Sequence, residues 1–179
     1  LSFKKRLMDK TTPEYWLRGP LEDIPALLQP AAYALLQTKL EAYRYTEDFE
    51  EKFLWETPFG RASIGFHLQH IAGVIDRMLT YAQQKQLSEI QFDYLEAEGK
   101  ANSEISLAIL LEHLDLKIDE ALNYFKQLIN TDLTEFRSVG RKELPSTQIG
   151  VLFHAAEHSQ RHIGQLLVTV SALKTRLNL

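Results

Sequence analysis

The sequence contains no cysteine, which excludes disulfide bridges, thiolate metal ligands and a cysteine nucleophile. It also lacks any apolar run approaching the ~18 to 20 residues that a membrane-spanning helix needs. The net charge is -4 and the lysines and arginines form no long cluster. Binding to nucleic acid or to a membrane surface therefore has no electrostatic support. Residues 1–6 are basic, but no apolar segment follows them, so we expect no signal peptide and a cytoplasmic location.

The remaining composition is that of an ordinary globular protein. The chain has 179 residues, of which 45% are hydrophobic and 25% are charged. A chain of this length suits one domain with its own hydrophobic core. We expect a single domain with its core at about residues 24–174 and an N-terminal extension at residues 1–20.

Apolar residues recur at helical spacing in four segments, and no segment reads convincingly as a strand. The pattern predicts helices over residues 24–45, 63–83 and 103–129, and from Ser146 or Thr147 to about residue 174. The third segment has the most regular apolar face, which includes Leu114 and ends at Ile129. The predicted fold class is all-α, a four-helix bundle.

Several residues mark where these helices begin. Asp23 is a candidate N-cap for the first helix, and Pro30 either kinks that helix or moves its start later. Ser63 is the N-cap candidate for the second helix. Ser88 and Gln91 have the spacing of a capping box, which predicts a short helix in the link between the second and third helices. The links over residues 85–102 and 131–145 are long, so the bundle need not run strictly up, down, up, down.

Five of the six histidines fall in two predicted helices. They are His67 and His70 in the second helix and His154, His158 and His162 in the fourth. Because residues four apart lie on one face of a helix, the three histidines of the fourth helix form a stripe. The sixth, His113, stands apart beside acidic residues and is expected to face solvent.

The stripe predicts a metal site. His158 and His162 have the spacing that lets two imidazoles bind one ion, and His70 can supply a third ligand from another helix. Three neutral imidazoles would leave a coordination position open, as in catalytic rather than structural sites. The alternative is a set of hydrogen-bonded core histidines. A di-iron carboxylate bundle does not fit, because the chain contains no Glu-x-x-His sequence.

Polar residues near the stripe are candidates for catalysis. Glu157 and Arg161 are the two candidates, although their spacing also predicts an ordinary surface ion pair. Asp76 beside Arg77 reads as a solvated pair, and Gln165 could orient the imidazole of a ligand. Gln160 is a further possible helper.

Two segments resemble the DinB-like (DinB/YfiT-like) family of metalloenzymes. One is Ser-Ile-Gly-Phe-His-Leu-Gln-His-Ile-Ala-Gly at residues 63–73, followed by Asp76 and Arg77. The other is residues 152–165, in which His-x-x-x-His is followed by Gly-Gln. Residues 139–141 and 144–147 also fit the family pattern.

The resemblance implies a four-helix bundle with a long crossover between its second and third helices. It also implies a divalent ion, zinc or nickel, held by His70, His158 and His162. Three imidazoles would suit iron or copper as well. His67 and His154 fall outside the family's usual triad. Members are commonly homodimers, and characterised relatives are S-transferases or isomerases that use bacillithiol, mycothiol or glutathione.

These observations favour a metal-dependent thiol S-transferase. A thiol that coordinates the ion would lose its proton near neutral pH and attack an electrophile. Because the chain has no cysteine, the thiol would arrive as a small-molecule cosubstrate. The alternatives are a metal-dependent hydrolase and a non-catalytic metal-binding or stress-response scaffold. The histidine positions do not separate these functions.

Overall fold

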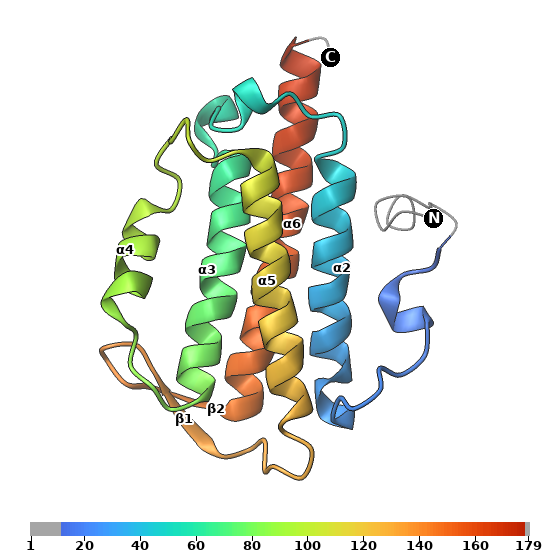
Figure 1. Ribbon diagram of the computed structural model, residues 1–179, viewed down its shortest axis with the longest axis vertical. Coiled ribbons are helices and arrows are strands. Elements are labelled where there is room, and N and C mark those ends of the chain that lie inside the picture. Colours follow the sequence, from blue (N-terminus) through green and yellow to red (C-terminus); the bar gives the residue numbers. More distant parts are fainter. Residues whose placement is uncertain (1–11, 178–179) are drawn as a thin grey trace.

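Four long helices lie side by side in the computed structural model, which describes residues 12–177 (Figure 1). They are α2 (Gln29–Tyr45), α3 (Ile64–Ala82), α5 (Leu107–Lys126) and α6 (Gln148–Leu177). The all-α bundle expected from the sequence is confirmed. The predicted N-terminal extension lies partly outside the described residues, which begin at Thr12.

The bundle is not an up-down-up-down bundle. Helices α2 and α6 run toward the upper end of Figure 1, whereas α3 and α5 run toward the lower end. Each of α2 and α3 packs against both α5 and α6. Because α3 and α5 are parallel neighbours, the chain between them must return along the full length of the bundle. This return is the long crossover, and it carries helix α4 (Glu89–Ala97).

Serine caps fix the starts of three helices, because a serine oxygen accepts a hydrogen bond from an otherwise unpaired N–H of the first turn. The Ser63 hydroxyl accepts from the Phe66 amide at 3.1 Å at the start of α3, as predicted. Ser88 and Gln91 form the predicted capping box of α4. Helix α5 begins at Leu107 with Ser106 as its cap, a few residues later than predicted.

The predicted start of the first helix is wrong. Asp23 is not a cap, because it has a positive φ of 59° and lies before a 3-10 turn at Ala26–Leu28. Helix α2 begins at Gln29, with Pro30 in its first turn. Proline is tolerated there because the N–H that it lacks would have no helical partner. Of the two predicted effects of Pro30, the later start is therefore the one observed.

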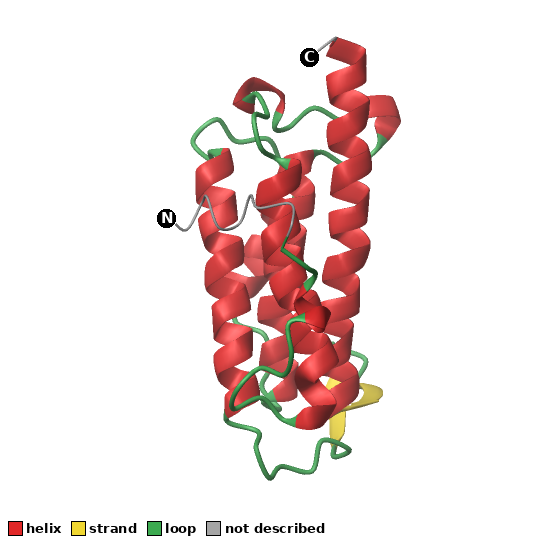
Figure 2. Ribbon diagram, turned by 90° about the vertical axis from the view of Figure 1, so that its right-hand side faces the viewer, coloured by secondary structure: helices red, strands yellow, loops and turns green. Residues whose placement is uncertain are grey.

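The link between α5 and α6 contains a β-hairpin, so the prediction of no strand is wrong. Strands β1 (Phe136–Val139) and β2 (Leu144–Thr147) pair antiparallel at the lower end of the bundle (Figure 2). The apolar residues Phe136 and Leu144 are exposed, whereas Arg137 is buried. Its Nε donates to the carbonyl of Ala82 at 2.7 Å, at the end of α3. Because the apolar residues are exposed and the buried residue is charged, the hydrophobic alternation typical of a strand does not appear in the sequence.

The core lies between the four long helices. Its largest fully buried side chains include Phe125, Leu114 and Ile118 of α5, as the apolar face predicted. Ile129 was expected on the same face, but it follows the helix and is exposed. Within residues 12–177, no helix combines the length and the apolar character that crossing a bilayer would require.

A pair of leucines in α5 tests this packing. Leu114 is 0% exposed and Leu116 is 53% exposed, and both lie within one helix. We expect Leu114→Ala to lower the free energy of unfolding by about 2 to 5 kcal/mol, because it removes buried surface and leaves a cavity. The matched variant Leu116→Ala should change it by less than about 0.5 kcal/mol. Urea unfolding followed by circular dichroism measures both, and equal effects would contradict the assigned face of α5.

Candidate metal centre

Helices α3 and α6 pack against each other and bring the histidines of both helices together. His70, His158 and His162 each place one ring nitrogen within 4.8 Å of the others'. The Nε2 atoms of His70 and His158 are 2.9 Å apart. The structure thus brings together the three residues that the sequence singled out as one candidate ligand set.

The rings of this histidine triad pack closely. Ring centroids lie 4.5 Å apart for His70 and His162 and 4.6 Å apart for His158 and His162. Phe66, one turn before His70, stacks nearly parallel on its ring at 5.0 Å. A stacked phenyl ring limits rotation of the imidazole, so His70 is held in one orientation.

The carboxylate of Glu98, which no sequence pattern predicted as part of the site, lies behind His70. The Oε2 atom of Glu98 is 2.6 Å from Nδ1 of His70, and its Oε1 accepts from Nη1 of Arg77 at 2.6 Å. The Glu98 side chain is only 4% exposed. An ionised carboxylate can only accept, so Nδ1 of His70 carries the proton and Nε2 presents its lone pair to the triad.

Gly73 makes room for this carboxylate. A Cβ atom at position 73 would collide with Oε1 of Glu98 and lie 2.7 Å from Nη1 of Arg77. Glycine inside a helix costs roughly 1 kcal/mol relative to alanine. Its presence in the middle of α3 is explained by the close approach of the Glu98–Arg77 pair.

The pairing of Arg77 with Glu98 corrects one expectation. Arg77 is buried and does not form a solvated pair with Asp76. Asp76 instead pairs with Nζ of Lys117 at 2.8 Å and accepts from the Gln91 amide at 2.6 Å. It therefore ties α3 to α5 and α4 and lies outside the triad.

His67 and His154 flank the triad on opposite sides. His67 is buried, and its Nδ1 is 3.1 Å from Nδ1 of His162. His154 has a side chain that is 46% exposed, and its Nδ1 is 2.7 Å from Oε1 of Glu157. Together with Glu157 and His158, it forms a second group with the spacing of metal ligands. Each flanking histidine therefore contacts one member of the triad.

Glu157 and Arg161 form the ion pair that their spacing predicts. Nη2 of Arg161 donates to both carboxylate oxygens of Glu157, at 2.9 Å and 2.6 Å. Burial opposes ionisation of Glu157, but hydrogen bonds from Arg161 and His154 outweigh it and lower the pKa of Glu157. A carboxylate with a lowered pKa is a weak base, which disfavours general-base catalysis by Glu157.

Three other polar residues have structural or surface positions. The Gln160 amide donates to the carbonyl of Ala34 at 3.0 Å and to the hydroxyl of Thr38, so it joins α6 to α2. Gln165 is exposed and lines a neighbouring pocket. His113 was expected to face solvent, but it is half-buried and lies 3.2 Å from the hydroxyl of Tyr94 in α4.

The environment keeps the imidazoles neutral. Burial, and then repulsion from His70 in its protonated form, lowers the pKa of His67 to about 4, of His158 to about 4 and of His162 to about 3. Neutral imidazole is the form that binds a metal ion. Nδ1 of His158 is buried and has no hydrogen-bond partner within the described chain. A donor set of neutral, converging ring nitrogens fits a divalent transition-metal ion.

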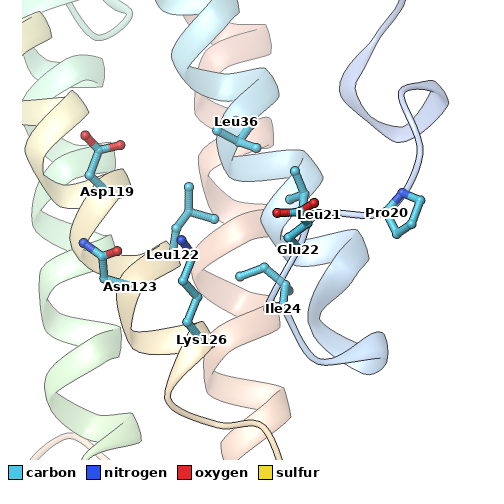
Figure 3. A pocket seen from close by; sticks show the side chains of 9 residues that line it. All are labelled: Pro20, Leu21, Glu22, Ile24, Leu36, Asp119, Leu122, Asn123 and Lys126. Atoms are coloured by element: carbon cyan, nitrogen blue, oxygen red, sulfur yellow. The ribbon is translucent and has the colours of Figure 1, made fainter.

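Two pockets at the bundle surface differ in their distance from the histidines. A groove of about 580 Å³ lies between residues 20–24 and helices α2 and α5 (Figure 3). No histidine lines it. A pocket of about 710 Å³ instead has His67 in its wall and opens between the start of α3 and α6. The second pocket is therefore the one that adjoins the triad.

The lowered pKa values predict how stability depends on pH in the metal-free protein. The unfolded chain takes up protons near the ordinary histidine pKa of 6.5, whereas folded His67 and His158 stay neutral to about 4 and His162 to about 3. Because the unfolded state binds more protons in this window, the free energy of unfolding rises with pH there. This contribution is complete above about pH 6.5 and is lost progressively below it.

Urea unfolding with a chelator present, at about pH 7.5 and about pH 5, measures this loss. His158→Gln provides the comparison, because it removes one of the histidines. It should therefore reduce the difference in the free energy of unfolding between the two pH values. Equal stability of the parent protein at both pH values would contradict the neutral state of the buried imidazoles.

Comparison with known proteins agrees with this geometry. The family model described as the DinB superfamily matches residues 34–166. This span includes all of α3, α4 and α5 and the part of α6 that carries its three histidines. A search of curated proteins finds no significant match. On the extent of the match, the chain belongs to the DinB superfamily.

Proposed function

We propose that this protein binds one divalent metal ion through His70, His158 and His162 and uses it to transfer a small-molecule thiol to an electrophile. The observation that carries the proposal is the convergence of three ring nitrogens within 4.8 Å, with Glu98 fixing the proton of His70. Membership of the DinB superfamily supports it, because the resemblance of the two histidine segments implies metal binding. Zinc or nickel is the proposed ion, with iron as the next choice.

When bound, the ion would supply a positive charge that lowers the pKa of a coordinated thiol. The thiol proton would leave to solvent, the thiolate would form a carbon–sulfur bond, and the leaving group would depart with its electron pair. The chain's own residues hold the site in place. Glu98 and Phe66 orient His70, and Arg77 holds the carboxylate of Glu98 in place.

The alternative is a closed, non-catalytic metal site in a scaffold protein, with His67 or His154 as a fourth ligand. The proximity of His67 to His162 is the observation that favours it. Two contacts support an open site instead. Of the three triad histidines, His67 contacts only His162, and it does so through Nδ1. Nδ1 of His154 is hydrogen-bonded to Glu157. A hydrolase with metal-bound water would use the same open position.

Metal content and thiol transfer test the proposal directly. Protein purified without chelators should hold about one equivalent of zinc, nickel or iron by elemental mass spectrometry, and His158→Ala should hold far less. The loaded protein should also speed the conjugation of bacillithiol, mycothiol or glutathione to monochlorobimane, which becomes fluorescent on forming a carbon–sulfur bond. His158→Ala should lose this activity together with the metal.

His113→Ala is the matched control, because His113 lies on α5 beside Tyr94 and belongs to neither ligand group. It should retain both metal and activity. Failure of the parent protein to take up any of the three ions would reject the metal site. Stoichiometric metal without acceleration of any thiol would reject S-transfer and favour the scaffold.

Glu98 generates a separate prediction about affinity. We expect Glu98→Gln to weaken metal binding by about 10 to 100-fold, because loss of a carboxylate behind a ligating imidazole reduces the basicity and order of that ligand. The matched control is Glu96→Gln, since Glu96 lies in the last turn of α4, two residues before Glu98, with a side chain that is 81% exposed. Competition with a fluorescent chelator gives both affinities. Equal affinity for the two variants would show that Glu98 does not support the site.

Two further expectations stay predictions, one from the family resemblance and one from the sequence alone. The homodimer stays a prediction, and size-exclusion chromatography with light scattering would measure it. The cytoplasmic location likewise stays a prediction.

A further inference from the structure

A pocket of about 710 Å³ adjoins the histidine triad at the point where the loop before α3 meets α6. We call it the arginine pocket because two arginines line it. Its lining residues are Gly60, Arg61, Ala62, His67, Arg161, Gly164, Gln165, Val168 and Thr169. The volume lies in the range of small-molecule sites, about 300 to 1,000 Å³.

The charge of the arginine pocket is opposite to that of the whole protein. The chain has a net charge of -4, yet the pocket is lined by Arg61 and Arg161 and by no carboxylate. Within residues 12–177, the guanidinium of Arg61 has no hydrogen-bond or ion-pair partner, and the backbone amide of Arg61 donates to the carbonyl of Pro58 at 2.9 Å. Arg161 uses only Nη2 on Glu157, so its Nη1 and Nε donors remain for another acceptor. Guanidinium groups bind carboxylate and phosphate groups in preference to neutral ones.

The rest of the wall connects this charge to the metal centre. His67 is buried in the wall, and its Nδ1 is 3.1 Å from Nδ1 of His162. Thr169 donates to the carbonyl of Ala62 at 3.4 Å, which ties α6 to the loop that carries Arg61. Val168 adds an apolar surface, and Gly164 leaves open space, since a Cβ there would meet nothing within 4 Å.

We propose that the arginine pocket binds a small organic anion, a molecule with an apolar body and one carboxylate or phosphate group that Arg61 and Arg161 hold. Its role as the place for the charged group of a substrate rests on the proposed metal-dependent function. Binding of the anion itself does not, because both arginines belong to the protein whether or not an ion is bound. Arg61 is the selecting residue, since Arg161 is already shared with Glu157.

Simple aromatic probes test the proposal on the full chain. Benzoate and phenyl phosphate present the two candidate groups, and benzamide is a neutral molecule of the same shape as benzoate. Titration of the 15N-labelled protein, followed by NMR, gives the Kd of each probe. At least one anion should bind about tenfold or more tighter than benzamide, as expected for charge-assisted hydrogen bonds. The two anions compared with each other show which group the pocket prefers.

Arg61→Gln should raise the Kd of the preferred anion by about tenfold or more and leave that of benzamide unchanged. Arg61 is exposed, so this variant should keep the parent's thermal unfolding temperature. Arg141→Gln is the matched control, because Arg141 lies in the hairpin turn against Phe92, outside the pocket. It should leave every Kd unchanged.

Three results would overturn the inference. They are equal binding of benzamide and the anions, an unchanged Kd in Arg61→Gln, and an equal loss of affinity in Arg141→Gln. The metal content of the same samples separates this inference from the proposed function. Arg61-dependent anion binding without bound metal would reject the metal-centred function alone. Bound metal without anion binding would reject the arginine pocket alone.

Discussion

The buried carboxylate of Glu98 is the group on which the candidate site depends most. A buried charge is costly unless it is paired and hydrogen-bonded, and Glu98 meets both conditions through Arg77 and His70. The pair with Arg77 balances the charge of Glu98 and leaves its second oxygen to accept from Nδ1 of His70. The Nε2 atom of His70 then faces His158 as an acceptor. One ion pair therefore sets the proton position in the imidazole that α3 contributes to the triad.

The topology of the bundle delivers that carboxylate. Because α3 and α5 are parallel neighbours, the chain between them must run back along α3, and α4 with Glu98 lies on this return (Figure 1). An antiparallel hairpin between these helices would have no segment available behind His70. Gly73 completes the arrangement by letting the carboxylate approach the axis of α3. The crossover and Gly73 thus both place the carboxylate of Glu98 where it supports His70, the candidate metal ligand on α3.

Local patterns in the sequence predicted the parts of the site that one helix determines. The four-residue spacing of His158 and His162 fixed their common face, and Ser63 and Ser88 correctly marked helix starts. Glu98 was missed because its partners lie 21 and 28 positions away, and no periodicity links residues across a folded crossover. The half-buried state of His113 was missed for the same reason, since Tyr94 of α4 covers it. The β-hairpin was not predicted, because the residue that it buries is an arginine.

The two sides of the triad differ in charge, and this difference bears on function. Behind His70, the Glu98–Arg77 pair is closed and neutral, so it adds no net charge to the site. On the side of His162, His67 leads to a pocket lined by two arginines and no carboxylate. A divalent ion in the triad would add its positive charge to that side, so the potential there would attract anions still more strongly. The same charge would favour a thiolate over a thiol at the ion. An anionic substrate and an anionic nucleophile would then be stabilised by one field, which lets the protein hold together two reactants that repel each other in water.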